Sequence, residues 1–232
     1  MTDLGVHRIK RPQSLTSLVV DQIRDLIITE HFTLGEPLSE NTLAAMLGVS
    51  RAPVRDAFMR LQIEGMVDVQ PQRGTFVFQY DATELREVCQ LREVLETGAL
   101  RIAMQYNHAE LVKALGEEVA LIDAAGTLTP QAYQPFDAAF HNALVRSSGN
   151  RELIDAYGRI SGRIRAIRHR LTRRPEQVEA SHRVHHTILR AIKRRRDEQA
   201  VAHLVEHVYT NYRRLLASTA PEATANKDAS GT

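Results

Sequence analysis

The chain has 232 residues, of which 43% are hydrophobic and 25% charged, with a formal net charge of +2. These values are close to the globular average, so we expect folded cores and, at this length, two small domains. No stretch approaches the roughly 18 apolar residues that a membrane span requires, and the N-terminus lacks the apolar region of a secretory signal. The single cysteine, Cys89, cannot form an intrachain disulfide, which fits a reducing cytosol. We therefore expect a cytoplasmic protein.

The first part of the chain combines helical and strand-like patterns. Apolar residues recur at helical spacing over about residues 15–30. Ser39 is a good N-cap for a second helix that Gly48 ends, and Ser50 can cap a third helix that Gly65 ends. Two strand-like runs, MVDVQ and TFVFQ, then flank the turn-forming residues PQRG. Three helices followed by a short hairpin predict a winged helix-turn-helix.

From about residue 81 the pattern is helical. Amphipathic stretches separated by short breaks cover about residues 81–105, 108–125, 130–147, 150–172, 176–195 and 197–217. They predict a bundle large enough to enclose a cavity. We therefore expect a mainly α fold, in which a winged helix-turn-helix with a small β-hairpin wing precedes an all-α bundle. The expected domains are residues 1–79 and 80–217, followed by a disordered tail at 218–232.

In the predicted winged domain, the positions of the basic residues indicate DNA binding, whereas their number does not. Residues 1–79 carry 8 Lys/Arg and 9 Asp/Glu, so overall charge does not indicate DNA binding. Arg51 and Arg55 lie one turn apart at the start of the third helix, which would enter the major groove, where an arginine fork can pair with guanine. On spacing alone, a solvated arginine pair remains the alternative. We assign DNA contacts to Glu40, Asn41, Ser50, Arg51, Ala52, Pro53, Arg55, Arg73 and Gly74, with further phosphate contacts from Arg8, Lys10 and Arg11.

The predicted bundle contains metal-binding residue types on its inner faces. Asp137 and His141 lie four residues apart on one helix face beside the core. His185 falls near the centre of an apolar stripe, and His207 flanks another stripe, with His203 nearer the solvent side. Three imidazoles and one carboxylate that point to one interior suit a divalent metal such as Zn²⁺, Ni²⁺ or Mn²⁺. The alternative, that each histidine is an ordinary hydrogen-bonded core residue, stays open on the pattern alone.

A resemblance to a known family covers residues 37–77, PLSENTLAAMLGVSRAPVRDAFMRLQIEGMVDVQPQRGTFV. In order and spacing this segment resembles the DNA-binding domain of GntR-type bacterial regulators, through the motifs L-G-V-S-R, P-V-R-[D/E]-A, E-G and G-[T/V]-F-V. The resemblance implies that Arg51, Arg55 and Gly74 lie at the DNA interface. Asn41 departs from the family pattern, because many members have arginine at that position.

A second resemblance covers about residues 81–215, through DAAFHNALVRSSGNREL and HHTILRAI followed by AHLVEH. These segments are similar to the FCD ligand-sensing domain of the FadR-like branch of the same family. The resemblance implies that a metal is bound by Asp137, His141, His185 and His207, with His203 as the alternative to His207. It also implies a small carboxylic acid effector near the metal, for which we assign Arg92 and Arg163 as contacts.

These observations predict a DNA-binding transcriptional regulator, a repressor, whose operator affinity depends on a small carboxylate bound near a divalent metal. Such a protein is expected to be a homodimer on a palindromic, double-stranded operator. In the alternative hypothesis, the metal itself is the signal. A metal-dependent enzyme that acts on a small acid is not expected, because no general base lies beside the ligands and the chain lacks a phosphate-binding loop and a nucleophile elbow.

Overall fold

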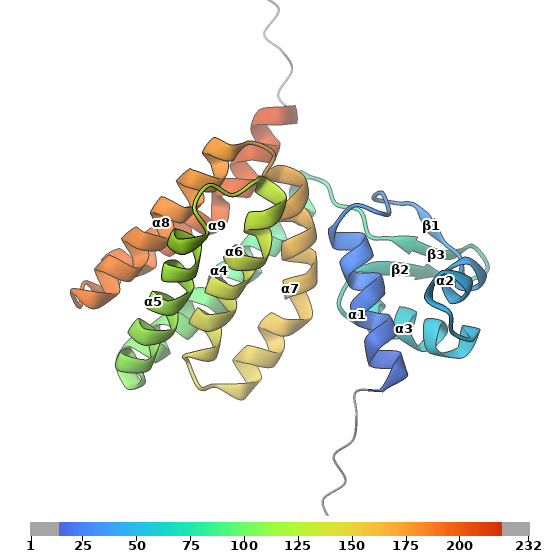
Figure 1. The fold of residues 1–232 in the computed structure, drawn as a ribbon, viewed down its shortest axis with the longest axis horizontal. Coiled ribbons are helices and arrows are strands. Elements are labelled where there is room, and N and C mark those ends of the chain that lie inside the picture. The colour runs from blue at the N-terminus through green and yellow to red at the C-terminus, as the bar shows by residue number, and fades with distance from the viewer. Residues whose placement is uncertain (1–13, 220–232) are drawn as a thin grey trace, which may run out of the picture. The chain divides into compact units, whose positions relative to one another are not determined.

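The structure is a computed structural model that describes residues 14–219 (Figure 1). Over these residues the fold is mainly helical, with a three-stranded antiparallel sheet, which confirms the predicted fold class. The described chain divides into two compact units, residues 14–79 with 150–170 and residues 80–149 with 171–219. Outside the described residues lie most of the predicted tail and the predicted arm contacts Arg8, Lys10 and Arg11.

The first unit contains the winged helix-turn-helix. Its elements in chain order are α1 (Leu15–Ile28), β1 (Pro37–Leu38), α2 (Glu40–Leu47), α3 (Arg51–Ile63), β2 (Val67–Gln70) and β3 (Gly74–Val77). Ser39 caps α2 by accepting from the Thr42 N–H, and Gly48 ends the helix in the left-handed conformation at φ 64°. β2 and β3 form the predicted hairpin. β1 pairs with β3 as a third strand, which periodicity could not predict because it has only two residues.

The packing of α3 on α1 sets the position of α3 within the unit. The Arg24 Nε and Nη2 atoms of α1 donate to the two carboxylate oxygens of Glu64, each at 2.8 Å, just after the end of α3. This pairing raises the pKa of Arg24 and fixes the C-terminal end of α3 against α1. The apolar side chains between the two helices are fully buried and include Ile23, Ile27, Val54 and Leu61.

Helix α7 (Arg151–Leu171) belongs by its packing to the first unit. The Nη2 atom of Arg170 donates to the backbone carbonyls of Ile27, at 3.0 Å, and Phe32, at 3.2 Å. The helix expected at 150–172 is present, and the hydrogen bonds of Arg170 join its C-terminal end to the winged helix-turn-helix. Periodicity identifies the apolar stripe of a helix but does not identify the partner that covers it.

The second unit is a bundle of α4 (Ala82–Tyr106), α5 (His108–Ala125), α6 (Pro130–Arg146), α8 (Pro175–Lys193) and α9 (Asp197–Thr219). Asp81 begins α4 with a capping box, in which its carboxylate accepts from the Glu84 N–H and the Glu84 carboxylate accepts from the Asp81 N–H. Helix α6 packs against α4, α5 and α8, and α9 packs against α4 and α8. This arrangement turns faces of α4, α6, α8 and α9 towards one interior.

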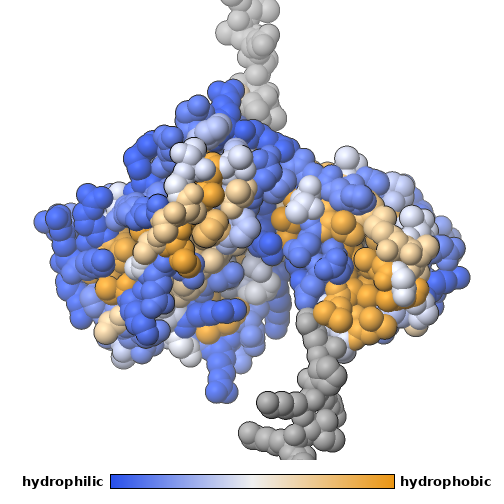
Figure 2. Space-filling model, viewed as in Figure 1, coloured by the Kyte–Doolittle hydropathy of each residue, from blue (hydrophilic) through white to orange (hydrophobic). Residues whose placement is uncertain are grey.

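The surface of each unit mixes hydrophilic and hydrophobic side chains. In Figure 2 hydrophilic residues are spread over the visible faces, with apolar areas between them. Within the described residues, no helix combines the length and the apolar character that a bilayer crossing demands.

Candidate functional site

The two arginines predicted to contact DNA bases lie at the start of α3, the predicted recognition helix. The side chains of Arg51 and Arg55 are each 59% exposed, and both contact the carboxylate of Glu40 at the start of α2. Arg55 donates from Nε to Oε1 at 3.0 Å and from Nη2 to Oε2 at 2.8 Å, and Arg51 Nη2 lies 3.3 Å from Oε2. The hydrogen bonds from Arg55, assisted by Arg51, lower the pKa of Glu40. Glu40 therefore orients both arginines, a role that the sequence did not reveal.

The other predicted DNA contacts lie at the starts of α2 and α3 and at the turn between β2 and β3. Four of them (Asn41, Ser50, Ala52 and Arg73) are exposed, and Pro53 is half-buried in the first turn of α3. Gly74 begins β3 at φ 113°, a conformation that L side chains rarely adopt, although a Cβ there would meet open space. The glycine is therefore required by the wing backbone and not by close packing.

The four predicted metal ligands meet inside the bundle. Asp137 and His141 come from α6, His185 from α8 and His207 from α9, and all are buried. One donor atom from each lies within 4.8 Å of the others. His207 Nε2 is 3.1 Å from His141 Nε2, 3.3 Å from His185 Nε2 and 3.9 Å from Asp137 Oδ1. The structure therefore brings together all four residues and places His207, not His203, among them.

A buried carboxylate orients His141. Glu96 of α4 accepts from His141 Nδ1 at 2.9 Å, so the lone pair of Nε2 points to the other donors. Arg92, also buried on α4, contacts Glu96 through Nε and approaches His141 Nε2 with Nη2 at 2.9 Å. Burial opposes ionisation of Glu96, but Arg92 and His141 outweigh it and hold the pKa of that carboxyl far below its usual range.

A hydrogen-bond chain orients His185 and connects it to Asp137. Tyr133 donates its hydroxyl proton to Ser181 Oγ at 3.0 Å, and Ser181 donates to Asp137 Oδ1 at 3.1 Å. The Tyr133 oxygen, 3.4 Å from His185 Nδ1, is therefore the acceptor for an Nδ1 proton. Phe140 stacks on His185 with ring centroids 3.9 Å apart. His185 Nε2 thus also presents a lone pair to the cluster.

Burial favours the neutral form of two of the cluster imidazoles, His207 and His141. Burial, with a contribution from His141, lowers the pKa of His207 to about 3, and burial also lowers the pKa of His141. Neutral imidazole nitrogens and an ionised carboxylate are the donor forms that a transition metal binds. A tetrahedral site with metal–nitrogen bonds of 2.0–2.1 Å separates its ligand atoms by about 3.3 Å, close to the spacings observed between the histidines. The donor set therefore fits a divalent transition metal.

The two arginines assigned to the effector lie in different units. Arg92 lies beside the cluster, as described above. Arg163 lies on α7, in the first unit, with its guanidinium carbon 5.6 Å from the centre of the Phe78 ring and its side chain close to Gly65.

Sequence reasoning missed the residues that support the ligands. Glu96, Tyr133 and Ser181 each orient a member of the cluster. A signal for them exists, because each lies four residues from a residue already singled out: Glu96 follows Arg92, Tyr133 precedes Asp137 and Ser181 precedes His185. At that spacing the two side chains share one helix face.

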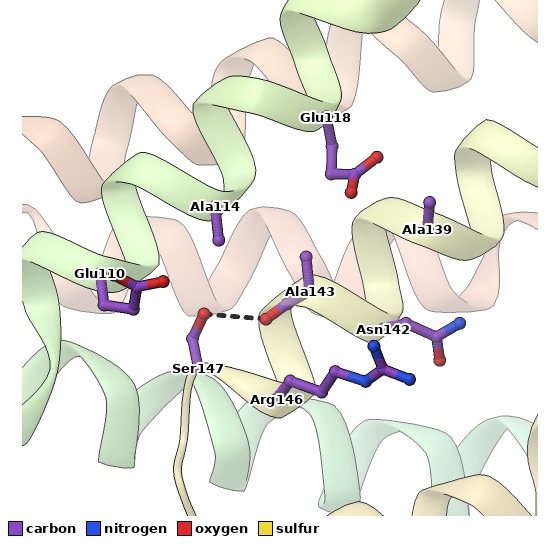
Figure 3. A pocket seen from close by; sticks show the side chains of 8 residues that line it. All are labelled: Glu110, Ala114, Glu118, Ala139, Asn142, Ala143, Arg146 and Ser147. Carbon is purple, nitrogen blue, oxygen red and sulfur yellow. Dashed lines mark hydrogen bonds between the residues drawn. The ribbon is translucent and has the colours of Figure 1, made fainter.

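A separate pocket of about 410 Å³ lies between α5 and α6 (Figure 3). Its lining includes the polar residues Glu110, Glu118, Asn142 and Arg146 together with three alanines. Ser147 at its edge donates to the Ala143 carbonyl at 2.8 Å. None of its lining residues belongs to the predicted ligand or effector set, so it is distinct from the cluster.

A winged helix-turn-helix in the same chain as a helical bundle with a buried set of metal-type donors defines a class of protein, the DNA-binding transcriptional regulators with a sensing domain. Two family comparisons agree with this class: the sequence model for bacterial regulatory proteins of the gntR family matches residues 15–77, and that for the FCD domain matches residues 87–210. The chain belongs to the GntR family and carries an FCD domain, so the predicted membership is confirmed.

Relatives with similar sequences are named as transcriptional regulators. The chain is 31% identical to the Nta operon transcriptional regulator of Aminobacter aminovorans, over 82% of this chain and 90% of that protein. It is 30% identical to the "Probable D-xylose utilization operon transcriptional repressor" of Paenarthrobacter nicotinovorans, over 64% and 68%. The solved structure of Escherichia coli McbR/YncC has the same fold, with a TM-score of 0.71 and 23% identity over 88% and 98%. The family and its relatives place the chain among transcriptional regulators and not among enzymes.

Proposed function

We propose that this regulator changes its operator affinity when a small carboxylic acid binds beside a divalent metal held by Asp137, His141, His185 and His207. The observation that carries the proposal is the meeting of three imidazole nitrogens and one carboxylate oxygen within 4.8 Å in a buried interior. Supporting hydrogen bonds orient two of those imidazoles, which is typical of metal ligands.

The acid-binding part of the proposal depends on Arg92. This guanidinium is buried and directs Nη2 at the cluster, where a carboxylate could accept a charge-assisted hydrogen bond. A six-coordinate ion such as Ni²⁺ or Mn²⁺ held by four protein donors would offer its remaining positions to carboxylate oxygens. Direct binding of the acid to the metal therefore requires a six-coordinate ion, because tetrahedral Zn²⁺ with the same four donors would be closed.

The regulatory step requires two arrangements of the protein that bind the acid with different affinity, because only a differential affinity shifts an equilibrium. We infer a homodimer that reads a palindromic operator with two copies of α3, since two-fold protein symmetry matches two-fold DNA symmetry. We infer repression as the sign of regulation, supported by the repressor name of the relative from Paenarthrobacter nicotinovorans.

Thermal melting of the full chain tests the proposal. The chain is stripped with a chelator, reloaded with Zn²⁺, Ni²⁺ or Mn²⁺, and screened against mono-, di- and hydroxycarboxylates. A ligand of the folded state at 100 times its Kd stabilises it by about 2.7 kcal/mol. We expect acids to raise the melting temperature only of the reloaded protein, and His141→Ala to abolish the shift. His203→Ala, on α9 but outside the cluster, should leave it unchanged.

A second candidate function is metal sensing, in which the metal alone is the signal. It is favoured by the completeness of the cluster, since four buried protein donors can satisfy a tetrahedral ion without an acid. Binding to an operator selected from random palindromic DNA separates the two functions. If chelation alone changes operator affinity and no acid has a further effect, metal sensing replaces the acid-dependent proposal.

A further inference from the structure

A second group of potential metal ligands lies at the edge of the bundle, outside the buried cluster. It consists of His182 and His186 on α8 and Asp123 on α5. His182 Nε2 lies 2.7 Å from Asp123 Oδ1, and His186 Nε2 lies 3.0 Å from the same oxygen. The two imidazole rings are adjacent, with centroids 4.6 Å apart. Three donor atoms from two helices thus meet at one point.

Helix geometry explains the arrangement. His182 and His186 are four residues apart, so they share one face of α8, whereas His185 is rotated into the core. The side chains of His182, His186 and Asp123 are 19%, 38% and 51% exposed. One helix therefore contributes a histidine to the buried cluster and two histidines to a group that water can reach.

The surroundings of the group favour a cation. Asp123 lies in the last turn of α5, where the helix dipole places partial negative charge. Two imidazoles can both bond to one carboxylate oxygen only if each carries a proton on Nε2. A single divalent ion between the three atoms replaces both protons and uses the lone pair of each ring.

We propose that Asp123, His182 and His186 form a second metal site, open to solvent, for a late first-row divalent ion such as Zn²⁺ or Ni²⁺. Two imidazoles and one carboxylate suit these ions, and three protein donors leave at least one coordination position for water. The site goes beyond the proposed function, because it shares no ligand with the buried cluster.

The second site has a structural consequence for the bundle. Ile122, next to Asp123, packs with Tyr133 and Val178, and Tyr133 bonds to Ser181 on α8. An ion held by Asp123 and the two histidines would tie the C-terminal end of α5 to α8 beside these contacts. Loading the site therefore stabilises the same helix that carries His185, by mass action on the folded state.

Equilibrium dialysis of the full chain, stripped with a chelator and equilibrated with Zn²⁺, tests the proposal. With three or four donors at each site, we expect about two ions per wild-type chain and about one in the double variant H182A/H186A. His203→Ala is the matched control and should keep the wild-type content. His141→Ala should lose the other ion, so failure of the buried site and failure of the second site are distinguishable. Equal zinc content in wild type and H182A/H186A would overturn the proposal.

A second variant, studied by absorption spectroscopy, distinguishes the loss of a metal ligand from the loss of metal through misfolding. In His186→Cys loaded with Co²⁺, a thiolate ligand should produce a sulfur-to-cobalt charge-transfer band in the near ultraviolet, absent from the wild type. The band should vanish when Asp123→Ala and His182→Ala are added. A spectrum of His186→Cys without that band, from protein that melts like the wild type in chelator, would also overturn the proposal.

Discussion

Replacement of Glu96 by alanine removes the carboxylate that connects the buried Arg92 to His141. The Glu96 side chain is fully buried and that of Arg92 is 4% exposed, so the variant leaves a guanidinium in the core without its counter-charge. Removing one partner of a buried ion pair costs about 3–5 kcal/mol. At a urea dependence of about 2 kcal/mol/M, the unfolding midpoint of the bundle should fall by about 2 M.

Urea titration in excess chelator, followed by far-ultraviolet circular dichroism, measures this loss without a metal contribution. The chain has no tryptophan, so helical dichroism is the better signal. Glu87→Ala, an exposed position on the same helix, is the control and should change stability by no more than about 0.5 kcal/mol. The Glu96→Ala protein should also bind metal about 10–100-fold more weakly, because His141 loses its orienting partner. If both variants unfold at the same urea concentration, the argument from the buried pair is wrong.

Three further predictions concern the winged unit. Arg55→Ala should weaken specific operator binding by about 1–3 kcal/mol in a fluorescence-anisotropy titration. An unchanged affinity would show that α3 is not the recognition helix. Glu40→Gln should strengthen binding to random DNA and steepen its salt dependence, because it releases the two arginines that Glu40 neutralises; an unchanged salt slope would contradict this. Arg24→Met should destabilise the unit by about 2 kcal/mol in thermal unfolding, since the half-buried Glu64 loses both its hydrogen bonds; a melting curve like the wild type would show that the pair is dispensable.

Much of the fold could be predicted because its signals are local. Ser39 and Gly48 define the ends of α2 through capping and backbone conformation, and the change from helical to alternating periodicity locates the hairpin. The burial of the proposed metal ligands also follows from periodicity, because a histidine on an apolar stripe faces the interior. His207 and His203 show this distinction: the first is buried with the other donors and the second is half-buried outside them.

The parts that the sequence did not predict depend on contacts between distant segments. Arg170 of α7 binds the backbone carbonyls of Ile27 and Phe32, and no local pattern indicates which unit a helix will join. The pairing of Glu40 with Arg55 joins residues 15 positions apart through the turn between α2 and α3. Such pairs become visible only when the angle between two helices is known.

The hydrogen-bond chain from His185 through Tyr133 and Ser181 to Asp137 begins and ends on two members of the same cluster. Each hydroxyl in it has one proton, so all the bonds must point in the same direction, and reversing one reverses the others. The tautomer of His185 and the acceptor state of Asp137 are therefore not independent. Loss of the single hydroxyl of Ser181 would interrupt the chain between Tyr133 and Asp137, so a change at one position on α8 would be felt at both of its ends.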